Sequence, residues 1–164
     1  MRTRLIVAGF ATVAALAVAV VAAQNPAKGQ AAPAKKAATP TPAACGDPPA
    51  DMKNVARDSR CFEMRTYVVT PEGPGSPDLI NQRFREHTVA FFRKHGMTIV
   101  GFWIPVDKPD TIVYILAYPD AAARDAAWAA FNADAEWQRV RAEMNVRLSV
   151  TNQFMNATDY SPMK

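Results

Sequence analysis

The pattern of hydrophobic and polar positions divides the chain into three stretches. Residues 5–23 are apolar or small and carry no charge, and residues 24–50 contain no Val, Ile, Leu, Met or aromatic residue. Periodic alternation of apolar and polar positions begins only at about residue 60. Because a folded core needs an apolar face on each helix or strand, a globular domain is expected only in the last stretch.

The last stretch predicts helices and strands in the order β-α-β-β-α-β. Runs rich in β-branched and aromatic residues predict four strands, at residues 62–69, 97–106, 111–118 and 150–157. A period close to 3.6 residues predicts two helical regions, the first over 77–95 and the second over 120–133 with a continuation at 135–145.

Local signals place the ends of these elements. Ser76 is expected to cap the first helix, with Pro77 at its first position, and Asp120 is expected to cap the second. Gly96 suits the left-handed stop of the first helix. The segment 107–110, Asp-Lys-Pro-Asp, suits the turn of a hairpin between the two middle strands.

This order of elements predicts a ferredoxin-like α+β domain, with helices on one face of a four-stranded antiparallel sheet. On the first strand Glu63, Arg65 and Tyr67 alternate with apolar residues, which predicts a side that faces water. Tyr67, Trp103 and Phe154 are expected on the face away from the helices, and an apolar patch of that kind needs a cover. A two-fold homodimer that packs sheet against sheet is the simplest cover.

The N-terminal stretch has the pattern of a secretory signal peptide over residues 1–23. Arg2 and Arg4 precede the uncharged run, and Val21-Ala22-Ala23 offers small residues for cleavage before Gln24. The alternative is an uncleaved membrane anchor, since nineteen uncharged residues just reach across a bilayer, although nine of them are Ala or Gly. We expect export by general secretion to a periplasmic or extracellular location, with membrane attachment only if the segment is uncleaved.

The segment 24–58 is expected to be an Ala/Pro-rich linker, followed by the folded domain at 59–164. Of the 27 residues in 24–50, nine are Ala and six are Pro. Such a segment cannot bury enough apolar surface to offset the entropy lost on ordering.

Charge and cysteine content exclude several classes. The chain has 19 Lys and Arg against 15 Asp and Glu, a net charge of +4. Residues 61–164 hold eleven basic and twelve acidic residues, so the excess of positive charge lies in the N-terminal part. This argues against nucleic-acid binding by the domain, which would need a basic face. Two cysteines are too few for a disulfide-rich scaffold or a four-Cys zinc site.

The two cysteines, Cys45 and Cys61, are expected to form a structural disulfide. In an oxidising compartment an even pair usually bridges. The alternative is a reactive or metal-binding thiol pair, which the loop-forming Gly, Asp and Pro residues after Cys45 do not favour.

Several short motifs of the domain follow one another in a specific order. They are Tyr67, Arg83-Phe84-Arg85-Glu86-His87-Thr88, Lys94-His95-Gly96-Met97, Val100-Gly101-Phe102-Trp103, Val113-Tyr114, Trp128 with Phe131, Glu136-Trp137 and Thr158-Asp159-Tyr160-Ser161-Pro162. Their order and spacing resemble the NIPSNAP family over about residues 60–162. The resemblance implies a dimeric α+β barrel of ferredoxin-like units. It implies no established reaction, and the signal segment and linker lie outside it.

His87 is the first candidate for chemistry. It falls within the apolar stripe that Ile80, Phe84 and Phe91 form on the first helix, so we expect it to face the sheet as a neutral imidazole. There it can act as a base or as a ligand of haem iron, with Arg65 or Tyr114 orienting a substrate. The alternative is a buried His that is hydrogen-bonded to a backbone carbonyl or to Tyr114.

Other candidates are placed around His87. A ligand pocket between helices and sheet is predicted, lined by Tyr67, Phe84, Phe91 and Trp103. Glu63 and Arg65 are expected to form a solvated ion pair at the sheet, and the alternative is that they line the mouth of a pocket and bind an anionic group. His95 is expected to interact with the C-terminal end of its helix.

Three functions remain open. The favoured one is an exported binding or assembly module whose dimer holds a small apolar ligand or a partner. The second is a cofactor-independent oxygenase or isomerase with His87 as base. The third is a haem protein with His87 as axial ligand, an analogy drawn from related folds alone. The sequence requires no cofactor, it has no G-x-S-x-G, H-E-x-x-H or phosphate-loop motif, and it sets up no nucleophile.

Overall fold

The computed structural model describes residues 45–46 and 51–164. The predicted signal segment, and all of the predicted linker except residues 45–46 and 51–58, lie outside the described residues. Among the described residues, no helix has the length and apolar character needed to cross a membrane.

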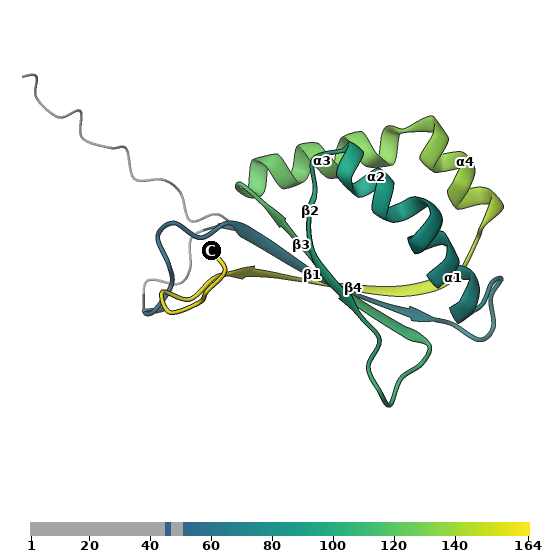
Figure 1. The fold of residues 1–164 in the computed structure, drawn as a ribbon, viewed down its shortest axis with the longest axis horizontal. Coiled ribbons are helices and arrows are strands. Elements are labelled where there is room, and N and C mark those ends of the chain that lie inside the picture. Colours follow the sequence, from purple (N-terminus) through teal and green to yellow (C-terminus); the bar gives the residue numbers. More distant parts are fainter. Residues whose placement is uncertain (1–44, 47–50) are drawn as a thin grey trace, which may run out of the picture. The chain divides into compact units, whose positions relative to one another are not determined.

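The predicted ferredoxin-like fold is confirmed. Four antiparallel strands form one sheet in the order β2-β3-β1-β4, with bounds β1 Cys61–Val69, β2 Thr98–Trp103, β3 Thr111–Tyr118 and β4 Leu148–Asn156. The helical segments lie on one face of this sheet (Figure 1), with bounds α1 Pro77–Arg83, η1 Phe84–Thr88, α2 Val89–Lys94, α3 Ala121–Ala133 and α4 Ala135–Glu143. Ser76 and Asp120 cap α1 and α3 as expected, through Leu79 N–H and Ala123 N–H.

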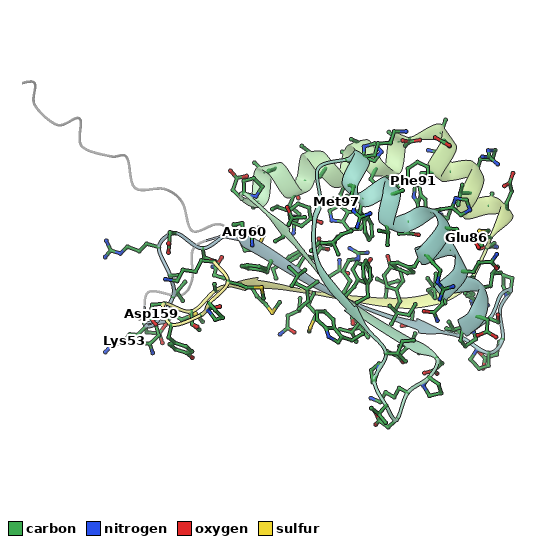
Figure 2. The ribbon with its side chains drawn as sticks, viewed as in Figure 1. Lys53, Arg60, Glu86, Phe91, Met97 and Asp159 are labelled. Carbon is green, nitrogen blue, oxygen red and sulfur yellow. A yellow bond between two sulfur atoms is a disulfide. The ribbon has the colours of Figure 1, made fainter. Side chains whose placement is uncertain are left out.

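The core lies between the helices and the sheet, and it is largely aromatic. Tyr114 is fully buried at its centre and packs edge-on against Tyr67 and Phe84. Phe92 stacks at a tilt on both Tyr114 and Phe131. Figure 2 shows side chains filling this layer. Aromatic contacts of this kind contribute about 0.5–1.5 kcal/mol each beyond area burial, so this face of the sheet is firmly covered.

One π-helical turn, η1, interrupts the expected single helix. Its signature is the bond from Val89 N–H to the carbonyl oxygen of Phe84, five residues earlier, and Thr88 Oγ1 also donates to Arg83 O at 3.2 Å. A π turn adds a residue, so every later side chain is rotated relative to a regular α-helix. Thr88 therefore takes the inward position, and the expectation that His87 faces the sheet is wrong. The side chain of His87 is 37% exposed.

The outer face of the sheet, away from the helices, has no charged residue at its strand positions, and the Arg60 guanidinium lies 5.4 Å from the centroid of the Phe62 ring at its edge. By strand alternation and register it carries Phe62, Met64, Thr66, Val68, Thr98, Gly101, Trp103, Thr111, Val113, Ile115, Ala117, Ser149, Thr151, Gln153 and Met155. Trp103 lies there as expected and is half exposed. Tyr67 and Phe154 do not, because both belong to the rows that face the helices. The prediction for these two residues is wrong.

The segments that flank the sheet are joined beyond the ends of β1 and β4. Val55 pairs with Thr158 in an isolated bridge, and Ser59 Oγ accepts a hydrogen bond from Ala157 N–H at 2.7 Å. The labelled Lys53, Arg60 and Asp159 mark this region in Figure 2. The predicted Cys45–Cys61 disulfide is present and attaches residue 45 to the first residue of β1.

An ionic cluster joins the end of α2 to the start of α4. Asp134 accepts from Lys94 Nζ at 2.8 Å and lies 2.9 Å from His95 Nε2, while its other oxygen caps α4 through Glu136 N–H and Trp137 N–H. The hydrogen bond from Lys94, supported by the Trp137 amide and His95, holds the pKa of Asp134 well below its ordinary value of 3.8. His95 thus lies at a helix end, as expected.

We expect Asp134→Asn to destabilise the domain most at neutral pH and progressively less as the pH falls below 3.8. A carboxylate with a lowered pKa in the folded state stabilises it above the ordinary pKa, and this contribution is lost as the pH falls toward the folded-state pKa. Asn is as good a helix cap as Asp, so the substitution isolates the charge. Urea unfolding at pH 7 and pH 3 measures the effect, with Asp107→Asn on the exposed hairpin as control. An equal difference from wild type at both pH values would contradict the prediction.

Candidate functional site

A cavity of about 610 Å³ lies between the sheet and the C-terminal helices. Strands β1 and β4 form its floor, α3 and α4 form its walls, and the last residue of α1 closes one end. Its lining is Glu63, Arg65, Tyr67, Arg83, Arg124, Asp125, Trp128, Phe131, Asn132, Trp137, Arg141, Asn145, Val146, Leu148, Val150, Asn152 and Phe154. The volume is in the range of small-molecule sites, and the lining combines aromatic rings with several polar groups.

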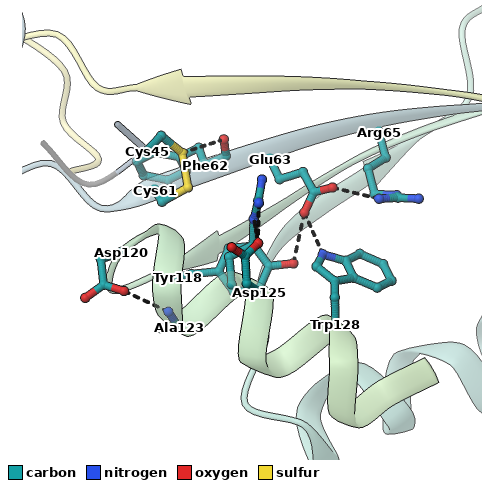
Figure 3. Close-up of polar contacts among 11 residues, drawn as sticks. Cys45, Cys61, Phe62, Glu63, Arg65, Tyr118, Asp120, Ala123, Asp125 and Trp128 are labelled. Carbon is teal, nitrogen blue, oxygen red and sulfur yellow. Dashed lines mark hydrogen bonds and ion pairs between the residues drawn. A yellow bond between two sulfur atoms is a disulfide. The ribbon is translucent and has the colours of Figure 1, made fainter. Parts of the chain in front are cut away.

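Glu63 is the centre of a buried hydrogen-bond network on one wall (Figure 3). Its carboxylate accepts from Arg65 Nη1 at 2.7 Å, from Trp128 Nε1 at 2.7 Å and from Tyr118 Oη at 3.2 Å. The Arg65 guanidinium also lies over the Trp128 ring, 4.4 Å from its centroid. The expectation of a solvated Glu63–Arg65 pair is wrong, because the helices cover this row of β1. The ion pair itself is present, and it is buried.

The network fixes the charge state of its members. Burial alone would lower the pKa of Arg65, but the neighbouring tyrosines Tyr67 and Tyr114 and the hydrogen bond to Glu63 raise it above its ordinary value. Burial, together with the Glu63 carboxylate, raises the pKa of Tyr118. Arg65 therefore stays charged and Tyr118 stays a neutral donor, so this wall carries a balanced ion pair.

Arg83 lies at the opposite end of the cavity, and no carboxylate among the described residues forms an ion pair with it. It is only 5% exposed, and its Nη1 donates to the backbone oxygen of Met144 at 3.1 Å. Its guanidinium lies 5.7 Å from the centroid of the Trp137 ring. Burial, to which the like charge of Arg141 adds, lowers the pKa of Arg83. In the described residues, Arg83 Nε and Trp137 Nε1 are buried donors without an acceptor.

Two of the predicted site residues line the cavity, and a third lies behind it. Arg65 and Tyr67 are on its floor. Tyr114 is fully buried in the core next to Tyr67, and its hydroxyl has no hydrogen-bond partner among the described residues. Burial raises the pKa of the Tyr114 hydroxyl well above its ordinary value, so it cannot act as a base at neutral pH.

The other predicted site residues lie elsewhere. Phe84 and Phe91 are packed in the core, and Trp103 is on the outer face of the sheet. His87 borders a shallow hollow on the solvent side of η1 and α2, with Glu86 4.0 Å away. The structure therefore does not bring His87 together with Arg65, and His87 is not part of the lining of the large cavity. Among the described residues there is no group of three or more His, Cys, Asp or Glu that could hold a metal ion.

The cavity contains several residues that sequence reasoning did not assign to a site. These residues are Arg83, Arg124, Trp128, Trp137 and Arg141. The alternation on β1 did place Glu63, Arg65 and Tyr67 in one row. The alternation did not indicate on which face of the sheet this row lies.

The fold and cavity define a ferredoxin-like α+β domain with a ligand-sized space between its sheet and its helices. The NIPSNAP family model matches residues 62–162, which is more than half of the chain. The chain therefore belongs to the NIPSNAP family, as its motifs indicated. A comparison with curated proteins finds no match.

Solved structures support the same fold. A NIPSNAP family protein of unknown function from Agrobacterium tumefaciens is 18% identical, with a TM-score of 0.58 over 68% of this chain and 99% of that one. A NIPSNAP-like domain protein from Burkholderia xenovorans is 21% identical, with a TM-score of 0.56 over 64% of this chain and 90% of that one. SnoaB, a cofactor-independent oxygenase from Streptomyces nogalater, is 18% identical over 63% of this chain and 98% of that one, and its TM-score of 0.48 supports no statement about activity.

Proposed function

We propose that this NIPSNAP domain is an exported binding module that holds a small organic molecule in the cavity between β1, β4, α3 and α4. The observation that carries the proposal is a cavity of about 610 Å³ whose lining combines aromatic side chains with Arg65, Arg83 and Arg141. Guanidinium groups beside aromatic rings suit a small organic molecule that carries oxygen acceptors.

The proposed module is a homodimer. The outer face of the sheet carries no charged side chain at the fifteen positions named above. Trp103 and Ile104 are half exposed beside it. A second copy can cover such a face without burying a charge, and a two-fold axis makes the same surface self-complementary.

Export supplies the conditions that the domain needs. The Cys45–Cys61 disulfide persists in oxidising compartments and is reduced in the cytosol. An N-terminal signal segment that directs the chain out of the cytosol is consistent with this requirement. The alternative of an oxygenase or isomerase with His87 as base loses its geometric support, because His87 lies outside the cavity.

Native mass spectrometry of the chain, purified from an oxidising compartment, tests the binding proposal. We expect a dimer that carries additional mass, because the cavity retains its ligand. Val150 lines the cavity and Val106 is fully exposed on the β2–β3 hairpin. Val150→Trp should therefore displace the additional mass, and Val106→Trp, which adds the same ring outside the cavity, should retain it. A monomer would contradict the dimer, and additional mass retained by Val150→Trp would contradict the cavity as the binding site.

A further inference from the structure

Arg83 is a buried cation without a carboxylate partner. The ion pairs of the described residues do not include it, and its acceptor is the neutral backbone oxygen of Met144. Burying an arginine costs free energy unless an opposite charge or a full set of acceptors compensates it. In contrast, Arg65 on the floor of the cavity has Glu63 at 2.7 Å. Arg65 therefore has a carboxylate partner among the described residues, and Arg83 does not.

The charges of the cavity are distributed unevenly. Four arginines and two carboxylates line it. Glu63 is paired with Arg65, and Asp125 is paired with Arg124. Arg83 and Arg141 remain, and they are close enough for the charge of Arg141 to lower the pKa of Arg83. The α4 end of the cavity thus has two positive charges without a paired carboxylate among the described residues.

Neutral donors lie at the same end. Trp137 is only 5% exposed, and its Nε1–H has no acceptor among the described residues. Its ring lies beside the Arg83 guanidinium. The amide of Asn145 is also part of the lining there. Guanidinium, indole N–H and amide groups are the donors that bind carboxylate, phosphate and other oxyanions.

The rest of the cavity lining is largely apolar or aromatic. Tyr67, Leu148 and Val150 lie along the floor, and Phe131 and Trp128 line the α3 wall. Aromatic rings favour a flat partner that can stack or pack edge-on. A molecule with an anionic group at one end and a flat apolar body at the other would satisfy both regions.

We propose that the ligand of this cavity is an organic anion, whose oxyanion group binds at Arg83 and Arg141, beside the Trp137 ring, while its flat apolar body lies over Tyr67 and Val150. This inference rests on the proposed binding function and adds the chemical class of the ligand. The oxyanion provides the charge that Arg83 lacks. A neutral molecule of the same shape would leave the buried Arg83 uncompensated.

Isothermal titration calorimetry on the exported, disulfide-bonded chain tests this inference with three matched probes. These are 2-naphthoate, 2-naphthyl phosphate and the neutral 2-naphthamide. We expect at least one anion to bind ten or more times more tightly than the amide, and the better anion identifies the headgroup as carboxylate or phosphate. Arg83→Met and Arg141→Gln should remove most of this preference. Arg85→Gln, on the solvent side of η1, should leave it unchanged.

The outcomes separate this inference from the proposed function. If the amide binds as tightly as both anions, the cavity binds ligands but the inferred anion preference is wrong. If none of the three probes binds at millimolar concentration, both the inference and the binding function fail for ligands of this size. A preference that survives in both Arg83→Met and Arg141→Gln would place the anion elsewhere and overturn the assignment. Arg141 is exposed, so Arg141→Gln decides the question even if Arg83→Met does not fold.

Discussion

Replacing Glu63 by Ala is expected to lower the free energy of unfolding by about 3–5 kcal/mol, the usual cost of removing one partner from a buried ion pair. The Glu63 side chain is 2% exposed and accepts hydrogen bonds from Arg65, Tyr118 and Trp128. Without the Glu63 carboxylate, the Arg65 guanidinium, the Tyr118 hydroxyl and the Trp128 indole N–H all lose a hydrogen-bond acceptor within the buried network. Urea unfolding followed by circular dichroism measures the change.

Two further variants establish that the effect comes from the buried charge. Glu86→Ala removes a carboxylate whose side chain is 48% exposed, and should change stability by less than about 0.5 kcal/mol. Glu63→Leu combined with Arg65→Leu should be more stable than Glu63→Leu alone, because the pair is removed together and no charge is left unpaired. A Glu63→Ala protein as stable as the wild type would show that the network does not hold β1 to α3.

The elements of the fold were predictable because each has a strong local signal. Ser76 and Asp120 cap helices in the structure as the sequence indicates, and Gly96 has the positive φ of 74° that ends α2. Strand pairing followed from the order of elements, because only a few arrangements of β-α-β-β-α-β are compact. These signals depend only on neighbouring residues in the sequence, so they can be recognised without knowledge of tertiary contacts.

The position of His87 was not predictable in the same way. A period of 3.6 residues places His87 in line with Ile80 and Phe84, but the π turn shifts the inward position to Thr88. The hydroxyl of Thr88 donates a hydrogen bond to the carbonyl oxygen of Arg83, five residues earlier. This bond is a local feature that accompanies the π turn.

The row of Glu63, Arg65 and Tyr67 shows a second limit. Alternation identified the row, but polar residues were taken to face water. Opposite charges two residues apart on one strand face neutralise each other at 2.7 Å, so the row can face the helices. The cavity itself combines residues from α1, α3, α4, β1 and β4, and only the tertiary structure brings Arg83 to Trp137.

Loss of the Cys45–Cys61 disulfide is expected to lower the free energy of unfolding by about 3 kcal/mol, because the bond closes a loop of about sixteen residues in the unfolded chain. In the folded state Cys61 is fully buried at the start of β1. The Cys45 N–H donates to Asn156 Oδ1 at 2.9 Å. The disulfide and this hydrogen bond together hold residue 45 against the end of β4. Urea unfolding of wild type and Cys45→Ala, both without reductant, measures the difference.

Reduction provides the matched control for this prediction. With dithiothreitol present, wild type should fall to nearly the stability of Cys45→Ala, since neither chain then has the cross-link, and the variant itself should not change. Cys61→Ala should be less stable than Cys45→Ala, because it also leaves space in the core beside Tyr118. If the oxidised wild type and Cys45→Ala unfold at the same urea concentration, the disulfide contributes nothing to the folded domain. The structural argument that the domain needs an oxidising compartment would then fail as well.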